Sequence, residues 1–297
     1  MRGTKEISRR IKSVQNTQKI TQAMEMVAAA KLYRAQEKAE AARPFTNNLR
    51  KTIARIFKHS LDINVPLLSE NQSQTNCFVV LTSDKGLCGS YNTNLFRLAD
   101  QEIQTAEDEV LIIAIGRKGR DTYRRKGYNI VREYIDLEDR PGFAQAREIG
   151  HYLLDLFMNN EIGSAKLIYS EFVNPMVQKP RSYQLLPLGG EHIQDGEQQE
   201  ESSYGDLGEI TYYSYEPDPE TVLRDLLPRF LNSLIYSGLL EAKASEFGAR
   251  MTAMRTATDN AKEMIDNLTL KYNKARQAAI TQEILEIVNT SEALKKE

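Results

Sequence analysis

The sequence contains few of the residues that commonly build catalytic and metal sites. Its 297 residues include only two cysteines and three histidines. Cys77 and Cys88 lack metal-ligand spacing and are too few for a disulfide framework, which favours a reducing compartment. His59, His151 and His192 are scattered along the chain, so they predict neither a catalytic triad nor a metal centre.

Long apolar runs are also missing. The longest aliphatic run, Val110–Ile115, falls far short of the ~20 residues that a membrane span needs. The basic start of the chain is not followed by an apolar core, so we expect no signal peptide. The sequence therefore predicts a soluble protein that reaches a membrane only through its partners.

The common nucleotide-binding motifs are absent as well. The loop Ser83–Gly89 follows an apolar run, where doubly wound sheets bind ligands, but it fits neither a phosphate loop nor a G-x-G-x-x-G fingerprint. It is either a ligand or partner loop or a tight strand-to-helix turn, and we favour the turn. The basic stretch Gly116–Arg120 is expected to be a solvated helix start, and Cys88 a buried structural thiol. We expect no cofactor, no metal and no catalytic residue.

The last part of the chain predicts a very long helix. Arg229–Leu294 contains no proline and only two glycines, and as a helix it would be ~100 Å long. Asp218 and Pro219 suit its start, and Pro228 marks a kink or restart. Apolar or small residues alternate at spacings of three and four, as in a helix that lies against another helix. These residues are Met251, Met254, Thr258, Ala261, Ile265, Leu268, Tyr272, Ala275, Ala279 and Gln282.

The first part of the chain has a matching pattern over Thr4–Arg43. Its spacing averages 3.5 residues, with one short step after Val14. The positions are Ile7, Ile11, Val14, Thr17, Thr21, Met24, Ala28, Leu32, Ala35, Ala39 and Ala42. Pro44 is expected to kink or interrupt the helix, which resumes over Phe45–His59. Because a folded middle must return the chain to its start, the two ends predict an antiparallel coiled coil.

The middle of the chain predicts an α/β fold. Strand-like runs alternate with helical patterns, which favours a mostly parallel sheet with flanking helices, a Rossmann-like body. The strands are expected at Cys77–Thr82, Val110–Ile115 and Lys166–Val173, and the helices at Tyr91–Glu107, from Gly116 to Lys126, and at Phe143–Asn159. Ser182–Leu188 and Gly208–Tyr215 suggest a hairpin at the sheet edge, and Gly189–Asp206 an exposed acidic loop. We divide the chain into 1–59, 76–218 and 219–297: N-terminal coiled-coil helix, body and C-terminal coiled-coil helix.

Charge is unevenly distributed along the chain. Residues 1–58 carry fourteen Lys or Arg against four Glu, whereas the whole chain has a net charge of -2. Such a basic arm suggests an acidic partner, either protein or nucleic acid, and the lack of interleaved aromatic residues disfavours nucleic acid. Small and amide residues at Ala257–Ala261 and Arg276–Glu283 predict a surface that touches a partner without locking to it.

Four separated segments resemble the gamma subunit of bacterial F-type ATP synthases, and the resemblance covers essentially the whole chain. They are SVQNTQKITQAMEMVAAAKLYRAQ (Ser13–Gln36), SDKGLCGSYN (Ser83–Asn92), YEPDP (Tyr215–Pro219), and a tail running from ATDNAKEMIDNL to ITQEILEIV within Ala257–Val288. The resemblance implies a non-catalytic central-stalk rotor whose coiled coil stands inside a ring of three alpha and three beta subunits. Proton flow through a membrane c-ring turns it, and the epsilon subunit binds its foot. It also implies a peripheral place at the cytoplasmic face of the bacterial membrane, without membrane insertion.

The resemblance also implies partner-binding residues, although helix packing or plain solvation is an open alternative for each. Beta-subunit contacts are implied for Arg9, Lys12, Lys19, Met24, Lys85, Arg276, Gln277, Thr281 and Glu283. Tyr212 and Tyr215 match the foot near the c-ring and epsilon. Two other functions stay open: a stand-alone nucleotide-binding α/β protein with a coiled-coil interaction arm, and a nucleic-acid-binding arm.

Overall fold

The computed structural model describes residues 2–59, 65–106, 108–189 and 215–294. They form two compact units. The body unit is Ala29–Arg250, and the coiled-coil unit combines Met1–Ala28 with Met251–Glu297. Helices α1 (Arg2–His59) and α6 (Pro219–Leu294) contribute to both units. No helix in the described ranges is long and apolar enough to cross a membrane.

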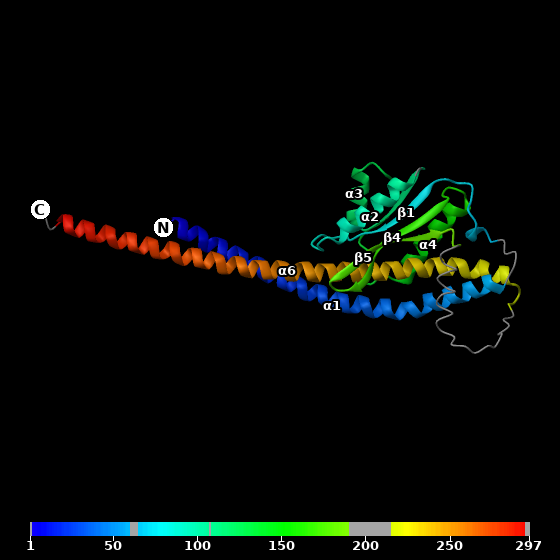
Figure 1. Cartoon of the computed structure of the whole chain (residues 1–297), viewed down its shortest axis with the longest axis horizontal. Helices are drawn as coiled ribbons and strands as arrows, with labels where there is room; N and C mark the ends of the chain where they lie inside the picture. The colour runs from blue at the N-terminus through cyan, green and yellow to red at the C-terminus, as the bar shows by residue number, and fades with distance from the viewer. Residues whose placement is uncertain (1, 60–64, 107, 190–214, 295–297) are drawn as a thin grey trace. The chain divides into compact units, whose positions relative to one another are not determined.

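The body unit is organised around a five-stranded sheet of order β3-β2-β1-β4-β5 (Figure 1). Its strands are β1 (Asn76–Leu81), β2 (Val110–Ile115), β3 (Asn129–Tyr134), β4 (Ser164–Asn174) and β5 (Val177–Leu186). The first four are mutually parallel, and β5 returns antiparallel to β4. β1 has no polar residue after Asn76 and is buried over its last five positions, as a central parallel strand should be.

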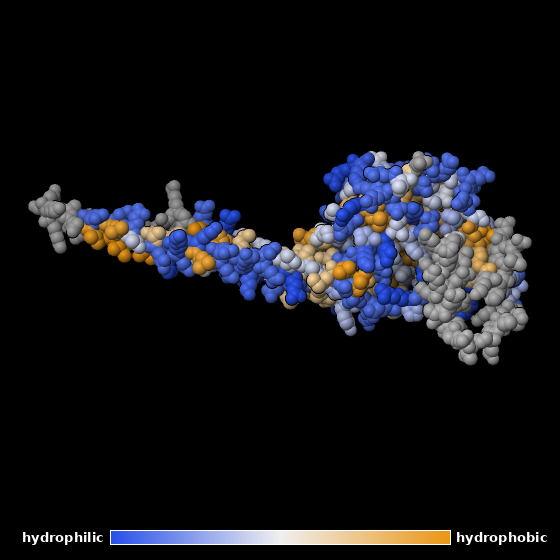
Figure 2. Space-filling view, viewed as in Figure 1, coloured by the Kyte–Doolittle hydropathy of each residue, from blue (hydrophilic) through white to orange (hydrophobic). Residues whose placement is uncertain are grey.

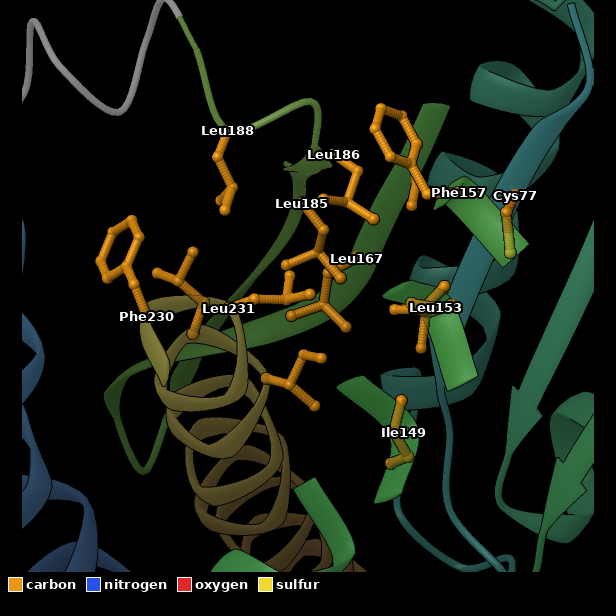
Figure 3. Packing of buried hydrophobic residues seen from close by; sticks show 14 of the residues in the cluster. Cys77, Ile149, Leu153, Phe157, Leu167, Leu185, Leu186, Leu188, Phe230 and Leu231 are labelled. Carbon is orange, nitrogen blue, oxygen red and sulfur yellow. The ribbon is translucent and has the colours of Figure 1, made fainter. Parts of the chain in front are cut away.

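Helices cover both faces of this sheet. They are α2 (Tyr91–Thr105), α3 (Arg117–Arg125) and α4 (Phe143–Met158), and a short 3-10 turn, η1 (Pro66–Leu68), precedes β1. Val80 on one face of β1 lies in a cluster with residues of α2 and α3. Val79 on the other face lies in the larger cluster, with residues of α4, α6 and the end of α1. Figure 3 shows Leu231 of α6, Leu167 of β4 and Leu153 of α4 in that core.

The predicted α/β body and its mostly parallel sheet are confirmed, with two corrections. β3 was not expected, because Asn129–Tyr134 is largely polar and only partly buried at the sheet edge. The edge hairpin is formed by β4 and β5 around a tight turn at Pro175, so the segment near Ser182 pairs with β4. The expected strand at 208–214 and the acidic loop at 190–206 lie outside the described residues.

Both terminal helices are continuous through their prolines. Pro44 lies inside α1 and Pro228 inside α6, so neither residue interrupts its helix. The predicted N-cap of α6 is confirmed, since Asp218 Oδ1 accepts a hydrogen bond from the Thr221 backbone N–H at 2.8 Å. The two glycines of α6 lie against the sheet: a Cβ added at Gly238 would be 2.6 Å from Leu167 Cδ2, and one at Gly248 would be 3.2 Å from Phe172 Cε2.

The antiparallel pairing of α1 with α6 is also confirmed. In the body unit Arg43 is hydrogen-bonded to Glu241 and Thr46 to Ser233. Residue numbers therefore increase along α1 where they decrease along α6, as in an antiparallel pair. In the coiled-coil unit Thr258 Oγ1 lies 2.8 Å from Thr21 Oγ1. That this coiled coil extends away from the sheet stays a prediction.

Burial in the coiled-coil unit follows the predicted seam closely. Between Asp259 and Ile280 the only positions shielded from solvent are Ala261, Ile265, Leu268, Tyr272, Ala275 and Ala279. Gln282 is exposed, so the seam ends before it. On α1, Thr17 is exposed and Gln18 is partly buried, which removes the short step expected after Val14. Gln18 therefore occupies the seam position that the predicted pattern had assigned to its neighbour Thr17.

Candidate partner-binding surfaces

The ligand-binding position of the sheet is closed. Doubly wound sheets bind ligands beyond the carboxyl ends of their strands, here beside Thr82. Gly116 has φ +94°, and a Cβ added to it would lie 2.2 Å from the Thr82 carbonyl oxygen. Gly119 N–H donates to Thr82 Oγ1 at 2.8 Å. The remaining cavity, lined in part by Tyr91 and Glu246, has a volume of about 10 Å³, which is too small for a nucleotide.

Helix α6 covers this position. Tyr91 donates its hydroxyl to the Ala242 carbonyl at 3.2 Å, and burial raises the pKa of Tyr91 well above its ordinary value. Glu246 is buried and pairs with Arg250 at 2.7 Å and with Lys243 at 3.5 Å. A buried carboxylate with two cationic neighbours is satisfied internally, so it offers no free group to a ligand.

The loop after β1 is a rigid turn that presents two side chains outward. Ser83 N–H donates to Asn92 Oδ1, and Asp84 Oδ1 accepts the backbone N–H of Arg117 at 3.0 Å. Lys85 is exposed, and Leu87 is 63% exposed in a left-handed backbone conformation with φ 62°. The left-handed backbone of Leu87 is strained, and such strain clusters at functional sites, so Leu87 marks this loop as a candidate contact.

Cys88 lies beneath this loop as the structural thiol that the sequence predicts. It is buried, and its Sγ lies 3.3 Å from Asn92 Nδ2. Cys77 is buried within β1, where burial raises the pKa of its thiol to about 12. His151 lies on exposed α4 surface, and the side chains of His59 and His192 lie outside the described residues. Across the described residues, no group of three or more His, Cys, Asp or Glu could hold a metal ion.

The basic residues implied for the first helix point into solvent. Arg9, Lys12 and Lys19 are exposed, and within the described part of the chain none of them forms an ion pair. Met24 is partly buried at one of the predicted seam positions. The three cations are therefore available to an acidic partner, while Met24 also contributes to helix packing.

The implied residues of the last helix are all exposed. Arg276 and Gln277 lie on the outer surface between the last two seam positions, whereas Thr281 and Glu283 follow the last one. Thr281 Oγ1 donates to the Gln277 carbonyl within its own helix. Among them lie apolar residues that sequence reasoning did not single out, with exposures between 47% and 69%. These apolar tip residues are Ile280, Ile284, Leu285, Ile287 and Val288. Figure 2 shows apolar surface along this end of α6.

The remaining implied residues are less informative. Tyr215 is partly buried and packs against the main core cluster, so it supports the body fold. Tyr212 lies outside the described residues. The signal for the tip residues was present in the sequence, because Ile280, Ile284 and Ile287 recur at helical spacing. No pattern in the sequence indicated Leu87, which stands between Gly86 and Cys88.

Comparison with known proteins decides the family. A family model described as ATP synthase matches residues 3–294. An ATP synthase gamma chain of Halothermothrix orenii is 47% identical over 99% of this chain and 100% of its own length. The chain belongs to the ATP synthase gamma-chain family. A relative from Acetobacterium woodii, named a sodium ion specific gamma chain, is 42% identical over 97% of this chain and 98% of its own.

Solved structures share the fold. A chain in the Euglena gracilis mitochondrial ATP synthase, solved with OSCP, F1 and c-ring, superposes with a TM-score of 0.66 at 20% identity. It covers 98% of this chain and 94% of its own. A chain of the Tetrahymena thermophila central stalk and c-ring gives 0.59 at 23% identity, covering 80% of this chain and 99% of that one. The expected body with a terminal-helix coiled coil is therefore a fold that known proteins adopt.

Proposed function

We propose that this chain is the rotating shaft of an F-type ATP synthase, which couples an ion-driven c-ring to ATP synthesis or hydrolysis in a ring of alpha and beta subunits. As a gamma-chain family member it is a central-stalk subunit of that complex. The observation that carries the proposal is the family match over residues 3–294. The chain supplies no catalytic group, because the chemistry occurs in beta, and it lies peripherally at the cytoplasmic face of the membrane through its partners.

The surface of the coiled-coil unit suits a contact that is made and broken. A shaft shifts a catalytic site only by contacting its open and closed states differently. The seam of α6 uses small residues such as Ala261, Ala275 and Ala279, and much of its outer surface before the tip is polar. Contacts of this kind are individually weak, because exposed charges are screened by water and salt.

The tip of α6 is chemically one-sided. Ile280, Ile284 and Ile287 recur on one face of the helix, whereas Glu283 and Glu286 lie on another. As such a tip turns, each surrounding subunit meets the apolar face and then the acidic face. This asymmetry supplies the differential contact that sequential switching of three sites requires.

Beta-subunit contacts are proposed for the exposed implied residues. Arg9, Lys12 and Lys19 are assigned to acidic loops of beta, with Met24 beside them. A further set on α6 is assigned to a loop of beta: Arg276, Gln277, Thr281 and Glu283.

Two further contacts lie in the body unit. Lys85 is assigned an ionic contact with beta, made without the bidentate geometry that arginine allows. Tyr212 and Tyr215 are assigned to the foot near the c-ring and epsilon.

Reconstitution tests the role. The chain is mixed with alpha and beta subunits, and the product is analysed by size-exclusion chromatography and ATP turnover. We expect a stable complex that hydrolyses ATP, and failure to co-assemble would contradict the proposal. The double variant Ile284→Asp/Ile287→Asp is expected to weaken coupling, with Asn289→Asp, an exposed position of the same segment that is assigned no contact, as the control.

The nucleotide-binding alternative receives no support from the carboxyl end of the sheet, where doubly wound folds bind ligands. The cavity of about 10 Å³ beside Thr82 leaves no room for a base and ribose. Calorimetry of the isolated chain with ATP is therefore expected to give no binding heat. A saturable signal would revive that alternative.

A further inference from the structure

Beyond the end of β1, helix α6 takes the place of a strand beside β4. β1 pairs with β4 only as far as Ile168, although β4 continues to Asn174. The β1-facing edge of β4 therefore has backbone groups without a strand partner. Ser245 Oγ donates to the Ser170 carbonyl at 2.8 Å, and Phe172 N–H donates to Glu241 Oε2 at 3.0 Å.

The two bonds match in spacing. Glu241 and Ser245 are one turn apart on α6, a rise of ~6 Å. Ser170 and Phe172 are two residues apart on β4, a rise of ~6.6 Å. A helix face with this spacing thus bonds the strand edge at two successive points, and a rotation of α6 about its axis would break both.

Glu241 also holds α1. Its Oε1 accepts from Arg43 Nη2 at 2.7 Å and from Nε at 3.2 Å, and this hydrogen bond raises the pKa of Arg43. A second link joins the helices where Thr46 Oγ1 lies 2.7 Å from Ser233 Oγ. One buried carboxylate, 8% exposed, therefore contacts β4 with one oxygen and α1 with the other.

These contacts differ in kind from the surrounding core. Apolar packing resists rotation through the close fit of side chains, but it is non-directional. Hydrogen bonds require alignment, and those to a charged group are the strongest. If α6 slipped, Glu241 would be left buried without its partners, a state that proteins strongly avoid.

We propose that Glu241 and Ser245 form the torque joint of the protein, the point at which the sheet fixes the rotation of α6 and, through Arg43, of α1. This inference rests on the proposed rotor function. Glu241 and Ser245 act as positioning residues, because neither touches a partner or substrate. Torque that enters the sheet passes into α6 first and reaches α1 through the Arg43–Glu241 pair.

The test uses the complete complex in ion-tight vesicles. Glu241→Gln/Ser245→Ala is compared with the parent in ATP hydrolysis, ATP-driven ion pumping, and rotation of a small unloaded probe. We expect the unloaded rate to stay within about twofold and the pumping-to-hydrolysis ratio to fall about fivefold, because the joint matters only under load. Glu220→Gln is the control, since among the residues that the structure describes Glu220 forms an ion pair only with Arg224 of the same helix.

Each outcome is decisive. A ratio equal to that of the parent, or one that falls only in proportion to the unloaded rate, overturns the joint. If the double variant does not assemble, Ser245→Ala alone is measured in the same way, with an expected fall of about twofold, and an unchanged ratio overturns the joint. A parent complex that neither assembles nor pumps would instead contradict the rotor function, so the two failures are distinguishable.

Discussion

The body unit and the coiled-coil unit use the same two helices but join them by different contacts. In the body unit α1 and α6 share the Arg43–Glu241 ion pair, and α6 buries Phe230 and Leu231 in the main core. In the coiled-coil unit the seam consists largely of small or partly exposed residues, with a hydroxyl pair between Thr21 and Thr258.

The contrast separates two mechanical requirements. A base that receives torque must hold its helices in one orientation, which directional bonds and a close-packed core provide. A shaft surface that meets successive partners must interact with each one weakly. The chain meets both requirements by changing the composition of the same helices along their length.

The largest expected effect comes from Gly116→Val in the body unit. Its φ of +94° and the approach of 2.2 Å to the Thr82 carbonyl leave no space for a side chain. We expect a loss of about 4 kcal/mol in the free energy of unfolding, measured by urea denaturation. Gly127→Val is the matched control: it has φ +81° but open space, and about 2 kcal/mol is expected. Equal losses in the free energy of unfolding would mean that backbone strain, and not the collision with Thr82, causes the destabilisation.

A second comparison truncates one apolar residue in each unit. Leu153 is 0% exposed in the main core, and Leu153→Ala is expected to cost about 3 kcal/mol. Ile265 in the coiled-coil seam is only partly buried, and Ile265→Ala is expected to cost about 1 kcal/mol. Native-state hydrogen exchange of each unit measures the two losses separately. The contrast fails if the seam residue costs as much as the core residue.

A third change removes the hydroxyl pair of the coiled-coil unit. Replacing both partners with apolar residues of the same shape, Thr21→Val/Thr258→Val, is expected to stabilise this unit by about 0.5 kcal/mol. Either single substitution leaves the other hydroxyl bonded only to its own helix, Thr21 to the Gln18 carbonyl or Thr258 to the Met254 carbonyl, and places it against a methyl group, so it should be less favourable than the pair. A double-mutant cycle followed by helical circular dichroism gives the coupling. Additive single effects would show that the hydroxyls do not interact.

The smallest effect concerns the start of α6. Two hydrogen bonds from Thr221 lower the pKa of Asp218 below its ordinary value of 3.8. The bond from the backbone N–H has the larger effect, and the bond from the hydroxyl the smaller one. Because the folded value is depressed, the stabilisation is complete above the ordinary pKa and is lost as pH falls through the folded one. The protection factors of the amides in the first turn, which correct for the intrinsic pH dependence of exchange, should therefore fall at low pH, and Asp218→Asn should remove most of this dependence.

Much of the fold was predictable because the relevant signals are local. Buried parallel strands such as Val110–Ile115 are continuous apolar runs, and the helix cap at Asp218 is a short motif. The heptad pattern gave the seam residues from Thr258 to Ala279 because period and burial coincide there. β3 was not predicted, because a half-exposed edge strand has neither a continuous apolar run nor a short capping motif.

The partner surfaces and the joint were less accessible. The exposed cations of the first helix were nameable only through the family resemblance, since charge alone does not distinguish a binding face from a solvated one. Glu241 looks like any acidic residue of a long helix until the end of β1 leaves the edge of β4 open. Its importance depends on contacts between residues that are distant in sequence.

The glycines of α6 carry one more consequence. Gly238 and Gly248 flank the bonded turn and face Leu167 and Phe172, where even a methyl group would collide or press tightly. Only a glycine fits at each of these two places without displacing a side chain, so α6 can pack on β4 in a single position along its length. If one contact between α6 and β4 were lost, the helix could not slide by a turn to replace it. The rotational position of α6 relative to the sheet is therefore fixed when the chain folds.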